Sequence, residues 1–161
     1  MEPEISGNKW RAIALLALCE VLALSLWFSA TALIPVLKDD FGLSGFHASL
    51  FTSAVAVGFV IGTLISALFS LADRIPPKHF FAGATLIAAI ANLSIIFMDP
   101  LSPMVIVMRL LTGICMAGIY PVGMKMVSTW AEKDTGLLVG LLVGALTLGS
   151  AAPHILNLLD T

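Results

Sequence analysis

Two ionisable side chains lie deep inside apolar stretches of the sequence, where a charge is costly. Glu20 lies about eight residues inside the first stretch, roughly 12 Å from its near end by helical rise. A carboxyl group at that depth faces a cavity or a partner rather than lipid. Two interpretations stay open: a carboxylate that binds a proton or faces a solute, or a neutral acid hydrogen-bonded between helices. Trp27 and Thr31 share its helical face and would make that wall partly polar.

Arg109 is the second such residue, about six positions inside the fourth stretch and roughly 9 Å from where that stretch begins. A guanidinium stays charged, so it requires an anion, water or carbonyl groups. The residues on its helical face, which we expect to line a cavity, are Thr112, Gly113, Met116, Tyr120 and Gly123. The alternative is that the long side chain reaches the membrane interface. Across a core of ~30 Å, Glu20 and Arg109 differ in depth by about 9 Å, which favours a shared cavity over a direct ion pair.

Five apolar stretches have to hold these side chains. They are Ala12–Val36, Ala48–Ala72, Phe80–Met98, Pro103–Val127 and Leu137–Leu159. Each meets or approaches the length of about 20 residues that a helix needs to cross a bilayer. The chain is 59% hydrophobic and only 11% charged, which excludes an ordinary soluble domain. We therefore predict an all-α, integral multi-pass bundle of five transmembrane helices in residues 12–159, after a tail of residues 1–11.

The basic residues predict the orientation of the chain, because Lys and Arg favour the cytoplasmic side of short loops. Six of them fall on one predicted side, and Lys38 alone falls on the other. The six are Lys9, Arg11, Arg74, Lys78, Lys125 and Lys133. We expect a cytoplasmic N-terminus in a cell membrane of the bacterial inner-membrane type.

Prolines, glycines and one amide predict turns and packing. Pro35 is expected to end the first span, with a turn at residues 38–42, and Tyr120–Pro121 is expected to bend the fourth. Asn92 is predicted to form a hydrogen bond between helices. The glycines expected to let helices approach closely are Gly58, Gly62, Gly113, Gly136, Gly140 and Gly144.

Two motifs resemble signatures of one transporter family. Leu71–Arg74, followed by Lys78, resembles the cytoplasmic signature G-x-L-A-D-R-x-G-R-K of the major facilitator superfamily, between spans two and three. Arg109–Gly113 resembles a second signature of that family, R-x-x-x-G, in span four. The residues that depart from the first signature are Phe69, Pro76 and Pro77.

This resemblance implies a secondary transporter that moves a small solute by alternating access, with twelve helices in two halves and the solute bound between them. The chain then corresponds to helices one to five, and we expect it to be a fragment that meets a missing C-terminal half or a second subunit. Glu20 would be a coupling or substrate carboxylate, and Arg109 would attract an anionic group or modulate protonation. Asp73, Arg74 and Lys78 would form a cytoplasmic latch. The solute stays open, small anions included, as does a coupling proton.

Two other classes of function compete with the transporter. A five-span interaction or assembly subunit without transport activity would bind partner helices on its glycine faces. An intramembrane enzyme is disfavoured, because the spans hold no paired carboxylates, metal-ligand spacing or Ser–His arrangement. We expect no catalytic residues, metal, cofactor or nucleic acid, and a lipid bilayer as the surroundings.

Overall fold

The computed structural model describes residues 2–131 and 134–159, which form helices and, within those residues, no strand. The helices are α1 (Glu2–Ala32), α2 (Ile34–Phe41), α3 (Gly45–Leu68), α4 (Leu71–Arg74), α5 (Pro77–Ser94), the 3₁₀ helix η1 (Ile95–Phe97), α6 (Pro103–Met116), α7 (Tyr120–Ser128) and α8 (Thr135–Leu159). The prediction of an all-α membrane bundle is confirmed.

Four segments of the described chain are long and apolar enough to cross a membrane. They are Lys9–Phe41, Gly45–Leu68, Pro77–Phe97 and Pro103–Ser128. The fifth predicted span falls on α8, a helix of 25 residues, in which Thr135–Leu148 is an apolar stretch of described residues. The division of residues 12–159 into five spans therefore stays a prediction.

The first span does not end at Pro35, and the expected turn at residues 38–42 is wrong. The chain breaks at Leu33 and continues as α2, with Pro35 in the first turn of that helix. A proline in a first turn gives up no helical hydrogen bond, because the N–H groups there have no partner within the helix. The helix ends at Phe41, and Gly42 follows it with a φ of 65°, so that the N–H of Gly42 bonds to the carbonyl of Lys38 and the N–H of Leu43 to that of Leu37.

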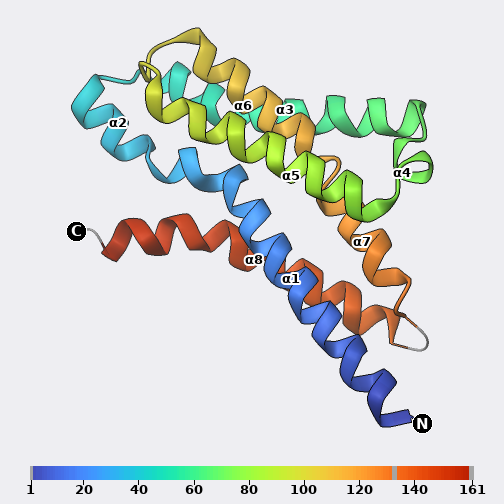
Figure 1. Ribbon diagram of the computed structural model, residues 1–161. Helices are drawn as coiled ribbons and strands as arrows, with labels where there is room; N and C mark the ends of the chain where they lie inside the picture. Colours follow the sequence, from blue (N-terminus) through green and yellow to red (C-terminus); the bar gives the residue numbers. More distant parts are fainter. Residues whose placement is uncertain (1, 132–133, 160–161) are drawn as a thin grey trace.

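Two pairs of long helices carry most of the packing. Figure 1 shows α3, α5 and α6 running together, while α8 crosses α1 on the other side of the molecule. Gly58 and Gly62 on α3 lie directly against the α6 backbone, and Gly113 on α6 lies against the carbonyl of Val55. Since a Cβ at any of the three would collide with main-chain atoms, these glycines set the distance between α3 and α6.

The fourth span is broken between α6 and α7, as the prediction of a bend at Tyr120–Pro121 requires. The N–H groups of Ala117, Gly118 and Ile119 bond to carbonyls three residues back instead of four. Pro121 has no N–H to offer the carbonyl four residues before it. The span thus consists of two helices that meet at a tight turn.

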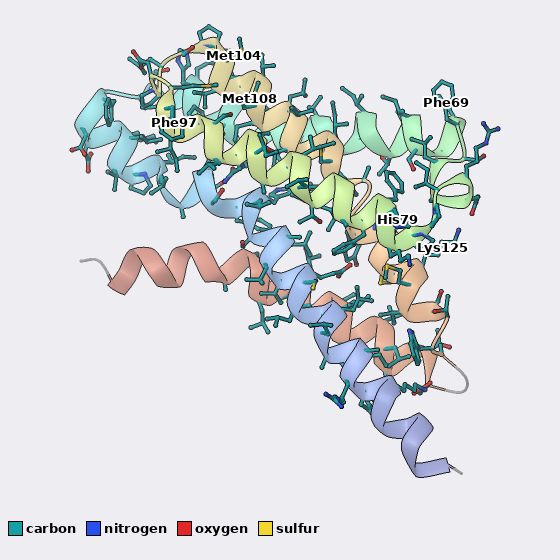
Figure 2. The ribbon with its side chains drawn as sticks, viewed as in Figure 1. Phe69, His79, Phe97, Met104, Met108 and Lys125 are labelled. Atoms are coloured by element: carbon teal, nitrogen blue, oxygen red, sulfur yellow. The ribbon has the colours of Figure 1, made fainter. Side chains whose placement is uncertain are left out.

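The connections between the helices lie at two opposite ends of the bundle. In Figure 2, Phe97, Met104 and Met108 lie at the end where η1 leads into α6, and Phe69, His79 and Lys125 lie at the opposite end. This second end holds the short helix α4, the start of α5 and the end of α7. The residues of the first family-like motif therefore lie next to α7.

Candidate functional site

Arg109 lies at the junction of four helices and is completely buried. From α6, its guanidinium donates to the carbonyls of Leu26 (3.0 Å) and Trp27 on α1. It also donates to the carbonyl of Phe51 on α3 (3.4 Å) and to Oδ1 of Asn92 on α5 (3.2 Å). Of the alternatives that its charge allowed, carbonyl groups are the partners found, and the side chain does not reach the interface.

Asn92 connects the same helices, so the prediction of an interhelical hydrogen bond is confirmed. Its Oδ1 accepts from the hydroxyl of Ser29 on α1 at 3.1 Å as well as from Arg109. The amide oxygen thus joins α5 to both α1 and α6. A partly buried amide oxygen with two donors has both of its lone pairs used, which fixes the position of all three groups.

Glu20 lies on α1, before Leu26 and Trp27 in the chain, and its carboxyl group is buried. Neither carboxyl oxygen has a hydrogen-bond partner among the described residues. The group packs against Gly123 on α7, where a Cβ would overlap Oε1. The missing side chain at Gly123 therefore makes the space that the carboxyl group occupies.

Glu20 and Arg109 do not bond to each other within the described residues. All the hydrogen bonds of Arg109 go to α1, α3 and α5, whereas Glu20 faces α7. Along α1, Glu20 comes first, and the two carbonyls bound by Arg109, those of Leu26 and Trp27, follow it. The same helix thus holds a fixed cation at one level and, at another, an acid with no hydrogen-bond partner among the described residues.

A pocket of about 530 Å³ opens at this level between α1, α3, α6, α7 and α8, and we call it the central pocket. Its lining residues are Leu24, Trp27, Phe28, Phe59, Met116, Tyr120, Leu146, Thr147 and Ser150. Each of them lies near the middle of its span or of α8. The indole ring of Trp27 meets the ring of Phe59 edge-on, with centroids 5.5 Å apart.

The predicted pathway residues are distributed unevenly around this pocket. Trp27 and Tyr120 line it, while Thr31 is half-buried further along α1 and is not among its lining residues. Arg109 and Glu20 flank it without lining it. Whether these residues form a solute or proton pathway stays a prediction.

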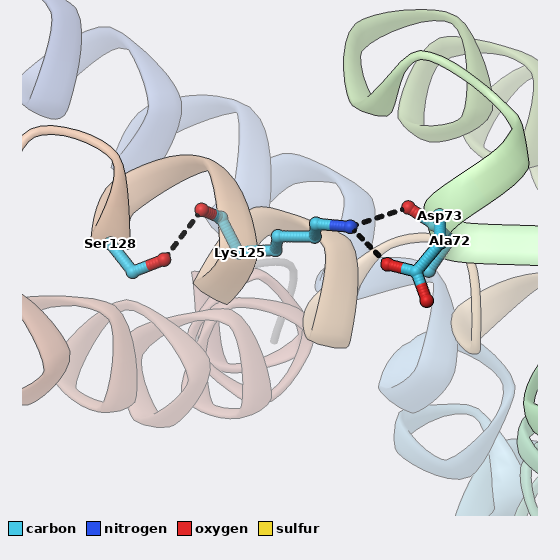
Figure 3. Close-up of polar contacts among 4 residues, drawn as sticks. All are labelled: Ala72, Asp73, Lys125 and Ser128. Atoms are coloured by element: carbon cyan, nitrogen blue, oxygen red, sulfur yellow. Dashed lines mark hydrogen bonds and ion pairs between the residues drawn. The ribbon is translucent and has the colours of Figure 1, made fainter. Parts of the chain in front are cut away.

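The predicted latch residue Asp73 forms an ion pair within this chain. Figure 3 shows the ammonium of Lys125 on α7 donating to the Asp73 carboxylate (2.6 Å) and to the Ala72 carbonyl (2.8 Å). This hydrogen bond and the positive charge of Lys125 lower the pKa of Asp73 below its ordinary value. Arg74 and Lys78 are exposed and have no hydrogen bond or ion pair in the part of the chain that the structure describes.

The second glycine group faces outward. A Cβ at Gly136, Gly140 or Gly144 on α8 would meet no atom within 4 Å. In the described chain these three glycines therefore differ from Gly58, Gly62 and Gly113, which lie in a helix contact. That α8 uses them to receive a partner helix stays a prediction.

Several residues of the site were not predicted. Phe59, Thr147 and Ser150 complete the walls of the central pocket, and Lys125 holds Asp73. A phenylalanine or a threonine in an apolar stretch looks the same in sequence whether it faces lipid or a pocket. Lys125 was visible only as one basic residue among several on the predicted cytoplasmic side. Among the described residues, no cluster of His, Cys, Asp and Glu could hold a metal ion.

Comparison with known proteins gives two matches. The family profile of the Major Facilitator Superfamily matches residues 16–153. An uncharacterized transporter of Buchnera aphidicola subsp. Schizaphis graminum (strain Sg) is 28% identical over 134 residues, which are 83% of this chain and 32% of the relative. The chain thus spans about a third of that relative's length. No solved structure matches.

Proposed function

Because the chain belongs to the Major Facilitator Superfamily, we propose that it forms part of a secondary transporter that moves a small solute across a cell membrane by alternating access. The chain is a multi-pass membrane protein with a transport role, and members of this family are generally not enzymes. The solute, the mechanism and the cytoplasmic position of the N-terminus are parts of the proposal.

One observation carries the proposal: a pocket in the middle of the spans lies beside a buried carboxyl group that has no hydrogen-bond partner among the described residues. The central pocket is large enough for a small solute, and Glu20 lies about one helical turn from Leu24 in its wall. An intramembrane carboxyl group is expensive to keep and marks proton or solute pathways. In this proposal Glu20 binds a coupling proton in the space that Gly123 provides.

A second helical half or a second subunit closes the pocket in the working transporter. Large apolar side chains are exposed along α1 and α8, such as Leu22 (62%) and Leu148 (65%), and the chain covers 32% of its relative. An alternating-access site needs walls on two sides. Arg74 and Lys78, which have no polar partner within the described part of the chain, are the latch residues left to contact that second part. The alternative of an interaction subunit without transport activity has no comparable observation in its favour.

The test replaces Glu20 by glutamine in the whole protein, reconstituted in liposomes that contain a pH-sensitive dye. The panel of solutes covers sugars, nucleobases, amino acids, organic acids and inorganic anions. We expect solute-dependent proton movement in the native protein, and its loss in Glu20→Gln with exchange of the same solute retained. Asp99→Asn, which changes a carboxylate in the turn before α6, is the matched control and should keep both activities. Proton movement that is unchanged in Glu20→Gln would remove Glu20 from the coupling.

A further inference from the structure

The lining of the central pocket differs sharply from that of a site for ions. Four aromatic rings, those of Trp27, Phe28, Phe59 and Tyr120, enter it from three helices. The remaining apolar walls are Leu24, Met116 and Leu146. Flat rings in such a pocket stack on, or meet edge-on, the face of another flat ring.

No charged side chain lines the central pocket within the described residues. Among the described residues the buried cation is Arg109, which already donates to three carbonyls and to Asn92. An anion in the pocket would lose its hydration without a positive partner, which is expensive. The carboxyl group of Glu20 lies against Gly123 and outside the lining, so it offers no contact for a bound cation.

The polar atoms of the α8 wall are arranged to accept hydrogen bonds. The hydroxyl of Thr147 donates its proton to the carbonyl of Val143 (3.1 Å), and the hydroxyl of Ser150 donates to the carbonyl of Thr147 (2.7 Å). A hydroxyl has a single proton, so while these two bonds are kept the oxygens offer a ligand only their lone pairs. A ligand that leaves both bonds in place has to bring its own N–H or O–H donor.

We propose that the central pocket binds an uncharged, planar aromatic or heteroaromatic solute whose N–H or O–H group donates to Thr147 or Ser150. The solute lies between the aromatic rings of α1, α3 and α7, with its donor edge toward α8. This inference rests on the proposed transport function and adds the class of solute. The walls that this chain contributes offer no cation to an inorganic anion, a solute class that the presence of Arg109 in the sequence had left open.

The test is equilibrium binding to the whole protein in lipid nanodiscs. The probes are adenine, uracil and nicotinamide, which are uncharged and carry N–H donors. Nicotinate is the charged counterpart of nicotinamide, caffeine is a planar ring system without an N–H donor, and nitrate is an inorganic anion. We expect at least one of the first three to bind more tightly than nicotinate, caffeine and nitrate. If none of the three binds, or if nitrate or nicotinate binds most tightly, the proposal is wrong.

Paired variants locate the binding. Thr147→Val keeps the shape of the side chain and removes the acceptor, and it should weaken binding of the donor-bearing probe about tenfold. Thr63→Val is the matched control, because the Thr63 hydroxyl also donates only to carbonyls of its own helix, α3, and does not line the pocket. Phe59→Leu should weaken every aromatic probe. Equal effects of Thr147→Val and Thr63→Val would overturn the assignment, and Ser150→Ala replaces Thr147→Val if that variant does not fold.

The experiments distinguish a failure of the proposed solute class from a failure of the proposed transport function. If proton movement with another class of solute depends on Glu20 while the aromatic probes do not bind, the transporter stands and the solute class is wrong. If the probes bind in a manner that depends on Thr147 but no solute is exchanged, the solute class stands and the transport proposal is wrong.

Discussion

Arg109 on α6 donates a hydrogen bond to the main-chain carbonyl of Trp27 on α1, the residue whose indole ring forms one wall of the central pocket. The guanidinium therefore holds the backbone of a residue in the pocket wall, although Arg109 itself does not line the pocket. A main-chain contact of this kind holds the backbone of residue 27 in place whatever its side chain is. Arg109 is best described as a positioning residue for the pocket.

Replacement of Arg109 by lysine should destabilise the bundle, because a single ammonium cannot replace a planar group that bonds to three helices at once. We expect a loss on the order of 2–4 kcal/mol, since hydrogen bonds from charged groups are among the stronger ones. Thermal unfolding in detergent, followed by circular dichroism, measures it. Arg74→Lys is the control, and an unfolding temperature of Arg109→Lys equal to that of the control would contradict the role.

Gly123→Ala should destabilise the chain only while Glu20 is present. The new methyl group would overlap the carboxyl oxygen, and overpacking of this kind costs about 1–3 kcal/mol. In a Glu20→Ala background the same change should cost much less, so the two substitutions are not additive. Unfolding of the four proteins of this double-mutant cycle gives the coupling. Gly83→Ala, at an open position on α5, serves as control, and additive effects would mean that the carboxyl group lies elsewhere.

The two groups of glycines should respond in opposite ways to an added methyl group. Gly113→Ala forces α6 away from the Val55 carbonyl on α3, and we expect a loss of folded protein in detergent. Gly140→Ala meets open space and should leave folding of the chain unchanged. If Gly140 receives a partner helix, the same variant weakens assembly in the membrane, which crosslinking measures. A folding defect in Gly140→Ala larger than that in Gly113→Ala would contradict the packing described.

Protection of the α4 turn should depend on pH through Asp73. Lys125 lowers the pKa of Asp73, so the pair is fully formed above the ordinary Asp value of about 3.9. It is lost as the pH falls through the lower value of the folded state. Hydrogen exchange at residues 71–74 should therefore be slow at neutral pH and faster in acid, after correction for intrinsic rates. Asp73→Asn should exchange fast throughout, whereas Asp99→Asn should match the native protein. An Asp73→Asn profile like the native one would exclude the pair as the cause.

The sequence predicted the helices well, because apolar length alone specifies a membrane-spanning element. It placed the break in the fourth span at Tyr120–Pro121 and the amide of Asn92 between helices for equally local reasons. It could not choose among the possible partners of Arg109, since main-chain carbonyls are present at every position. The end assigned to the first span at Pro35 was wrong because a proline is compatible with the first turn of a new helix.

The walls of the central pocket were harder to predict for a physical reason. In a bilayer, lipid-facing and pocket-facing positions are both apolar, so hydrophobicity does not distinguish Phe59 from a ring that contacts lipid. The glycine contact between α3 and α6 fixes which face of α3 meets α6, and in this arrangement Phe59 lies edge-on to Trp27. The polar exceptions, Glu20 and Arg109, could be found by type, but the partners of Arg109 and the place of Glu20 against Gly123 could not.

The tight turn between α6 and α7 divides the fourth span into two helices that are held by different contacts. α6 is held to α3 by glycine contacts and to α1 by Arg109, while α7 is held to the α4 turn by Lys125. Met116 and Tyr120, on either side of this turn, both line the central pocket. A change in the direction of α7 at this turn would therefore alter the wall of the central pocket at Tyr120, while the glycine contacts between α3 and α6 stayed in place.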